Sequence, residues 1–189
     1  MLRHLPNLIT LLRMALVVPL CWMISDGRYD AALLVAAIAG FSDALDGYIA
    51  KRCGWQSWIG GMLDPVADKL LLTAAFVWLA LVGGIAGWLA ALIVGRDLVI
   101  VAGAVAYHNL VGRFDAAPSR LSKLTTVVQI AYVLLELLRL SNWIELPRIL
   151  HLAAIAAVAV LTVASGLHYL FAWGRRARDV VRSRKETIR

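Results

Sequence analysis

The sequence is poor in charge and in cysteine, and each shortage argues against a class of protein. Only 16% of its 189 residues are charged, 61% are hydrophobic, and the mean hydropathy is +0.78. A soluble domain usually carries about 25% charged residues, so this composition indicates an integral membrane protein. Cys21 and Cys53 form no CxxC pair, which argues against a disulfide framework and against a cysteine zinc site.

Histidine offers no metal site either. His4, His108, His151 and His168 show no spacing typical of metal ligands, so we expect them in polar linings or helix interfaces. The chain also shows no internal repeat, no low-complexity segment and no separate soluble part. We therefore expect a single membrane domain over residues 1–189.

Long apolar runs fill most of the chain. Residues 1–25 read as an amphipathic segment that leads into a first spanning helix. Further runs, each near the roughly 20 residues that cross a bilayer, cover about 31–50, 60–82, 88–107, 124–140 and 149–173. The sequence predicts an all-α polytopic membrane protein with six transmembrane helices and an N-terminal amphipathic segment.

A cleaved signal peptide is the alternative for the N-terminal segment. Arg13 interrupts its apolar part, and no small-x-small cleavage site precedes Asp26, so we disfavour that alternative. Asn7, Thr10 and Arg13 recur every three residues and form one polar stripe. This stripe either lies at the membrane interface or faces a polar site, and the sequence favours neither.

Basic residues lie at alternate ends of the apolar runs. They occur at the N-terminus, after the second and fourth runs and in the tail: Arg3, Lys51, Arg52, Arg113, Arg120, Lys123, Arg175, Arg176, Arg178, Arg182, Arg184, Lys185 and Arg189. The positive-inside rule then predicts cytoplasmic termini, and we expect a bacterial cytoplasmic membrane. Tryptophans fall near both sides as aromatic belts do: Trp55, Trp58 and Trp173 near the cytoplasm, and Trp22, Trp78, Trp88 and Trp143 near the other side.

The net charge of +7 follows the same pattern. A nucleic-acid protein would carry it in an exposed polar domain, whereas here it flanks apolar runs. We therefore expect membrane lipids rather than nucleic acid as partners, with the basic cytoplasmic tail 174–189 contacting anionic headgroups.

Four carboxylates stand out within 26 residues. Asp43 and Asp46 are three residues apart, and Asp64 and Asp68 are four apart, so each pair shares one face of a predicted helix. Two such helices facing each other would form an oxygen-rich site of the kind that Mg²⁺ prefers. The alternative is a set of solvated or salt-bridged surface acids. Acids beside membrane segments are costly without a function, which favours the metal site.

Such a site suits phosphoryl transfer. Two ions about 4 Å apart can hold a diphosphate and neutralise charge on the leaving phosphate. One carboxylate can take the proton of an attacking hydroxyl. Gly47 would let a nucleotide approach its helix closely, or else would serve helix packing. Lys51, one turn further on, would reach a phosphate or act as a positive-inside residue.

These residues carry a resemblance to a known family. The signature D-x2-D-G-x2-A-R-x8-G-x3-D-x3-D of the CDP-alcohol phosphotransferases resembles the stretch Asp43-x2-Asp46-Gly47-x2-Ala50-Lys51-x8-Gly60-x3-Asp64-x3-Asp68. One position differs, because Lys51 stands where the family has Arg. The change keeps the charge but loses the bidentate fork, and Arg52 is a candidate substitute. The family's six spans and cytoplasmic termini agree with the topology predicted above.

The resemblance implies the reaction and the roles of the residues. The enzyme would bind CDP-diacylglycerol, transfer its phosphatidyl group to an alcohol acceptor and release CMP. Two Mg²⁺ ions, with Mn²⁺ as the alternative, would be held by Asp43, Asp46, Asp64 and Asp68, and Asp68 would also be the general base. The CDP group would be contacted by Pro6, Asn7, Gly47, Lys51 and Ser57. Two copies of the chain could pair as a homodimer.

Two further stretches bear on the acceptor. Gly95-Arg96-Asp97 and residues 118–126 are more similar to CMP-forming cardiolipin synthases than to phosphatidylglycerophosphate synthases. Phosphatidylglycerol, giving cardiolipin, is thus the first prediction, and glycerol 3-phosphate is the alternative acceptor. Arg96 and Lys123 are candidates to hold the acceptor's phosphate. Otherwise Lys123 is a positive-inside residue and Arg96 forms a buried pair with Asp97.

Two rivals come from other classes. A cation-coupled membrane transporter would place its acids near mid-membrane, in broken helices with a repeat-related partner, and no such repeat is visible. An intramembrane aspartyl protease would need two acids deep in the membrane, whereas here four are predicted near one surface. We therefore favour the phosphatidyltransferase.

Overall fold

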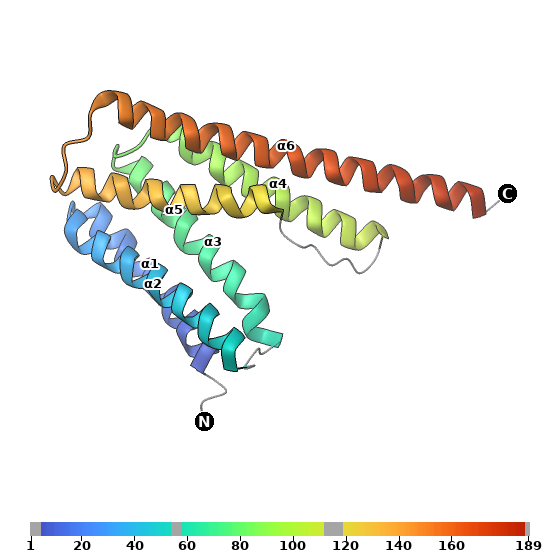
Figure 1. Ribbon diagram of the computed structural model, residues 1–189, viewed down its shortest axis with the longest axis horizontal. Coiled ribbons are helices and arrows are strands. Elements are labelled where there is room, and N and C mark those ends of the chain that lie inside the picture. Colours follow the sequence, from blue (N-terminus) through green and yellow to red (C-terminus); the bar gives the residue numbers. More distant parts are fainter. Residues whose placement is uncertain (1–4, 54–57, 112–118, 188–189) are drawn as a thin grey trace.

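The computed structural model describes residues 5–53, 58–111 and 119–187, and the side chains within 12–42, 69–103 and 119–171. Over this part of the chain it is all-α, as predicted, with six helices and no strand (Figure 1). The helices are α1 (Leu5–Ser25), α2 (Tyr29–Cys53), α3 (Trp58–Leu81), α4 (Gly87–Val111), α5 (Arg120–Leu140) and α6 (Arg148–Thr187). Four of the six helices, α2 to α5, begin and end within a few residues of the ends of the predicted apolar runs.

The two termini differ from the prediction in extent. The amphipathic segment and the first predicted span form one continuous helix, α1. At the other end α6 continues to Thr187, past the end of the predicted apolar run near residue 173, so residues 174–187 of the basic tail are helical. Arg and Lys are good helix formers. An apolar run therefore predicts where a helix can cross lipid, not where the helix ends.

Two described stretches are long and apolar enough to cross a membrane, namely Arg120–Leu140 and Arg148–Phe171. Shorter apolar stretches cover Leu12–Ser25, Tyr29–Ser42 and Lys69–Leu81. The charged pair Arg96 and Asp97 interrupts the apolar sequence of α4, although the helix itself is continuous. The described part of the chain therefore has six helices, whereas six membrane crossings stay a prediction.

The helices pack as two groups that share α3. α1 packs on α2 and α3, α4 packs on α3 and α6, and α5 packs on α2, α3 and α6. Figure 1 shows the connections α1–α2, α3–α4 and α5–α6 at one end of the molecule, while the C-terminal end of α6 projects at the far side. This up-and-down order follows from the short connections between antiparallel neighbours.

The core is apolar and draws on every helix. α3 contributes Leu72, Phe76 and Leu79, which recur at helical spacing and are buried on one face. Phe76 stacks on Tyr132 of α5 with 6.1 Å between ring centroids.

The outer surface of the bundle is apolar as well. Each helix exposes large hydrophobic side chains, among them Val18, Phe41, Leu81, Leu98, Val127 and Ile149. A helix that is apolar on both its inner and its outer face is typical of a protein that meets lipid.

Candidate active site

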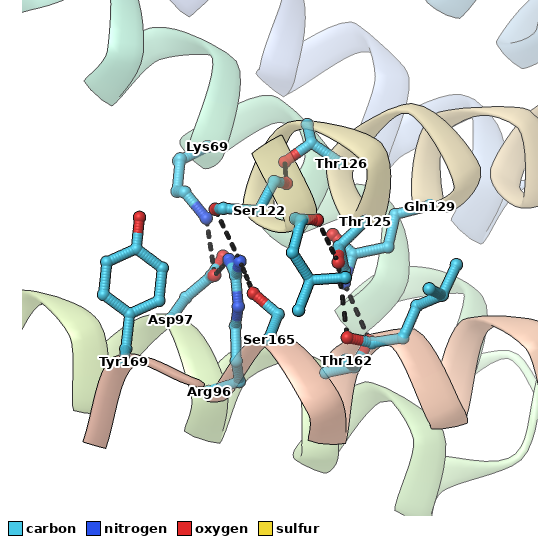
Figure 2. Close-up of polar contacts among 12 residues, drawn as sticks. Lys69, Arg96, Asp97, Ser122, Thr125, Thr126, Gln129, Thr162, Ser165 and Tyr169 are labelled. Carbon is cyan, nitrogen blue, oxygen red and sulfur yellow. Dashed lines mark hydrogen bonds and ion pairs between the residues drawn. The ribbon is translucent and has the colours of Figure 1, made fainter. Parts of the chain in front are cut away.

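Arg96 and Asp97 form a buried ion pair in α4. Arg96 Nη1 donates to Asp97 Oδ1 at 2.6 Å, and the two side chains are 2% and 13% exposed. Arg96 Nη2 donates to Ser122 Oγ of α5 at 2.7 Å and to Ser165 Oγ of α6 at 2.6 Å. A buried charge is costly unless it is paired and hydrogen-bonded. These contacts offset that cost and tie α4 to two further helices (Figure 2).

Lys69 of α3 joins the same centre. Its Nζ donates to Asp97 Oδ1 at 2.5 Å, so one carboxylate oxygen accepts from both Lys69 and Arg96, as Figure 2 shows. The Lys69 side chain is 39% exposed. We call Lys69, Asp97 and Arg96 the ionic centre. With two cations and one carboxylate, its formal charge is +1.

The first turn of α5 lies against this centre. Ser119 caps the helix by accepting a hydrogen bond from the Ser122 backbone N–H at 3.1 Å. The Ser119 backbone N–H in turn donates to the Tyr169 hydroxyl of α6 at 3.3 Å. The N-terminal end of α5, which carries the positive end of its helix dipole, is therefore fixed beside Arg96.

Lys123 follows Ser122 and is exposed. Its side chain makes no hydrogen bond or ion pair with another described residue, whereas Arg96 uses both terminal nitrogens in such contacts. The nitrogen Nε of Arg96 is buried and has no partner among the described residues. Of the two residues predicted to contact the acceptor's phosphate, Lys123 is exposed. Arg96 is paired with Asp97 and buried, as in the alternative interpretation of that residue.

The predicted carboxylates lie on two helices. Asp43 and Asp46 are in α2, and Asp64 and Asp68 are in α3, so the helical backbone on which their pairing depends is present. Their side chains lie outside the described residues, as do those of Pro6, Asn7, Gly47 and Lys51. Ser57 lies in the segment 54–57, which is also outside.

The donor set fits a hard divalent cation. Four carboxylates and no sulfur or imidazole ligand are what Mg²⁺ or Mn²⁺ would select. Elsewhere, among the side chains that the structure describes, no group of three or more His, Cys, Asp or Glu could hold a metal ion. The aspartate stretch of α2 and α3 is therefore the candidate metal site, and the ionic centre begins one residue after its last member, Asp68.

A polar seam continues from the ionic centre between α5 and α6. Thr125 Oγ1 donates to the Leu161 carbonyl at 3.3 Å, and Gln129 Nε2 donates to Thr162 Oγ1 at 3.1 Å. Thr125, Gln129 and Thr162 are fully buried (Figure 2). Hydrogen bonds of this kind hold helices together where lipid offers no hydrophobic drive.

A second ionic cluster lies at the C-terminal end of α5. Glu136 is fully buried; its Oε1 lies 2.6 Å from His151 Nε2, and its Oε2 accepts from Arg139 Nε at 2.7 Å. Arg139 Nη2 also donates to the Gly84 carbonyl at 3.1 Å. His151 thus has the interface role expected from the sequence.

Lys69, Ser122 and Ser165 were not predicted as site residues. For Lys69 a signal existed, because it precedes Leu72 by three residues and Phe76 by seven and so continues the buried stripe of α3. A lysine on that stripe needs a carboxylate partner. Nothing in the sequence distinguishes Ser165 from the other small residues of α6.

Comparisons with known proteins agree with this reading. The family model for CDP-alcohol phosphatidyltransferase matches residues 3–168. A probable phosphatidylglycerophosphate synthase of Mycobacterium tuberculosis is 34% identical over 187 residues, covering 94% of this chain and 83% of the relative.

Two further relatives differ in their printed acceptor. The cardiolipin synthase (CMP-forming) of Rattus norvegicus is 28% identical over 197 residues, covering 95% of this chain and 64% of the relative. The CDP-diacylglycerol–glycerol-3-phosphate 3-phosphatidyltransferase of Pseudomonas fluorescens is 42% identical over 105 residues, or 52% of this chain and 53% of the relative. With the aspartate signature on α2 and α3 and a family match across most of its length, the chain belongs to the CDP-alcohol phosphatidyltransferase family of phospholipid-synthesising membrane enzymes.

Proposed function

We propose that the protein is a divalent-metal-dependent phosphatidyltransferase that uses CDP-diacylglycerol and releases CMP. The observation that carries the proposal is the family match over residues 3–168, which includes all four aspartates of the signature. The placement of these aspartates on α2 and α3, with the cationic side chains of Lys69, Arg96 and Lys123 following, supports it.

Asp43, Asp46, Asp64 and Asp68 would hold two Mg²⁺ ions, with Mn²⁺ as the alternative. Bound there, the ions would neutralise the diphosphate of the CDP-lipid. The CDP group would be contacted by Gly47, Lys51 and Ser57, helped by Pro6 and Asn7.

Asp68 would act as the general base. It takes the proton of the acceptor's hydroxyl, and the oxygen then attacks the lipid-attached phosphorus. A new phosphorus–oxygen bond forms, the bond to the CMP oxygen breaks, and CMP leaves with the bonding electron pair. Proton removal by a positioned carboxylate contributes about 10²–10⁴-fold to such a step.

The first candidate acceptor is phosphatidylglycerol, with cardiolipin as product, on the similarity of Arg96-Asp97 and residues 118–126 noted above. Its phosphate would be held by Lys123 and by the charge of Arg96. Arg96 donates to Asp97, Ser122 and Ser165 and its side chain is 2% exposed, so it would act on the acceptor's phosphate through its charge.

The second candidate is glycerol 3-phosphate. The Mycobacterium tuberculosis relative, named a probable phosphatidylglycerophosphate synthase, favours it because its identity of 34% exceeds the 28% of the cardiolipin synthase from rat. Both acceptors carry a phosphate and a primary hydroxyl, so the same residues serve either.

The proposed membrane arrangement has six spans, both termini in the cytoplasm and the aspartates at the cytoplasmic end of α2 and α3. The exposed Trp22, Trp88 and Trp143 support it, since they lie near the helix ends that would face the opposite side. A homodimer remains an expectation.

The test uses purified protein in liposomes with Mg²⁺ and CDP-diacylglycerol, and offers each acceptor in a separate reaction. We expect CMP together with cardiolipin from phosphatidylglycerol. Product from glycerol 3-phosphate alone would assign the second candidate. No CMP with any polar alcohol, together with cation flux across the liposome, would reject the enzyme in favour of a transporter.

A further inference from the structure

We propose that Lys69, through Asp97, is a positioning residue that sets the rotation of α3 and thereby the metal affinity of the aspartates on that helix. This inference rests on the proposed function for the metal site itself. It assigns to the ionic centre a role separate from acceptor binding.

Contacts between helices fix how a helix is rotated in lipid. Lipid tails are as apolar as leucine, so close side-chain packing and interhelical hydrogen bonds, rather than the hydrophobic effect, select one rotation of a helix over another. Directional polar contacts therefore add to the packing of Leu72, Phe76 and Leu79 in selecting the rotation of α3. Among the side chains that the structure describes, Lys69 of α3 makes such a contact with Asp97 of α4.

The carboxylate that Lys69 contacts is itself held by Arg96. Asp97 accepts from Arg96 at 2.6 Å, and Arg96 is held by Ser122 of α5 and Ser165 of α6. The stem of Arg96 also lies along α6, where a Cβ on Gly166 would be 3.5 Å from its Cγ. Asp97 is therefore tied through Arg96 to α5 and α6, and Lys69 attaches α3 to Asp97.

The position of Lys69 along α3 is next to the aspartates of that helix. It continues the buried stripe of Leu72, Phe76 and Leu79 at its N-terminal end. The next residue toward the N-terminus is Asp68, about 1.5 Å further along the helix axis, and Asp64 is about one turn beyond it. Because the backbone of α3 is one continuous helix over these positions, a rotation of the helix at Lys69 also rotates the backbone positions of both aspartates.

The prediction is a loss of metal affinity when this link is cut. Lys69→Met keeps the Arg96–Asp97 pair and so spares the buried charge, whereas Asp97→Asn removes the partner of both cations. We expect Lys69→Met to weaken Mn²⁺ binding about tenfold, as removal of a group that orients a ligand does. Lys69→Arg, which keeps a cation on the same stripe, should restore binding to within about threefold of the natural protein.

The measurement is Mn²⁺ binding to the purified full-length protein in detergent, without substrate, followed by electron paramagnetic resonance of the free ion. Arg148→Met is the matched control, because it removes an exposed cation at the start of α6. The double variant Lys69→Met/Asp97→Asn should bind Mn²⁺ no more weakly than Asp97→Asn alone, since both changes break one link. Thermal unfolding of each variant identifies any that fails to fold.

The outcomes separate the inference from the proposed function. If the natural protein binds no Mn²⁺, the metal site of the proposed function is wrong. Normal Mn²⁺ affinity in a folded Lys69→Met variant, with a raised KM for the acceptor, would overturn the inference and make Lys69 a substrate contact. Lower thermal stability with normal Mn²⁺ affinity would overturn it too, since Lys69 would then be structural only.

Discussion

Glu136 and His151 join α5 to α6 at the end of the bundle opposite the ionic centre, with 2.6 Å between Oε1 and Nε2. Glu136 is fully buried, whereas His151 is 27% exposed. Because Arg139 donates to the second carboxylate oxygen of Glu136 and also to the Gly84 carbonyl, this cluster ties the α3–α4 connection to α5 and α6.

Replacing Glu136 should therefore cost stability and not chemistry. In Glu136→Gln, Arg139 and His151 lose their shared anion, and we expect the free energy of unfolding to fall by about 1–3 kcal/mol. Thermal unfolding in detergent measures the change. Glu145→Gln, on the exposed α5–α6 connection, is the control. CMP release per folded molecule should stay at the natural rate, and a selective loss of that rate would show that the cluster acts on the site.

The hydrogen bonds from Arg96 to Ser122 and Ser165 should contribute more to stability than bonds between neutral groups do. Ser165→Ala removes a hydrogen bond to a buried charge, which typically contributes about 1.5–3 kcal/mol. We expect the unfolding midpoint to fall in Ser165→Ala and to fall further in Ser122→Ala/Ser165→Ala. Ser141→Ala, which loses only a local bond to the Leu138 carbonyl, is the comparison. Equal midpoints for Ser165→Ala and Ser141→Ala would mean that Arg96 does not depend on Ser165.

Lys123 offers a test of acceptor binding. Because its side chain is exposed and uncommitted among the described residues, Lys123→Ala should leave the fold intact. We expect the KM for the acceptor to rise about tenfold, the loss of one charge-assisted contact, and the KM for CDP-diacylglycerol to stay unchanged. Steady-state kinetics with each substrate varied in turn measures both. An unchanged acceptor KM would leave Lys123 as a positive-inside residue.

Asp68 is the decisive position for the chemistry. Asp68→Asn keeps the size of the side chain and removes the base, so turnover should fall by at least about 10²-fold while the protein is still produced and folded. CMP release and thermal unfolding measure the two effects. Asp30→Asn, an exposed carboxylate in the first turn of α2, is the matched control. Natural turnover in Asp68→Asn would remove the assignment.

The helices and the motif were predictable because their signals are local. Hydrophobic length fixes where a helix forms, so the predicted runs match α2, α3, α4 and α5 within a few residues. The spacing of Asp43, Asp46, Asp64 and Asp68 needs only helix geometry and the chemistry of oxygen ligands. The ends of α1 and α6 were less predictable, since hydropathy does not report how far a helix continues beyond its apolar run.

The sequence by itself therefore determined an all-α membrane protein, its family and its candidate catalytic aspartates, since composition, run length and residue spacing are sufficient for these. Only the tertiary structure decided that Lys69 meets Asp97 across α3 and α4, and that Arg96 takes Ser122 and Ser165 as partners. Those residues are 28, 26 and 69 positions apart in the chain. No local pattern encodes such a meeting, because the rotation of each helix is chosen by all of its neighbours together.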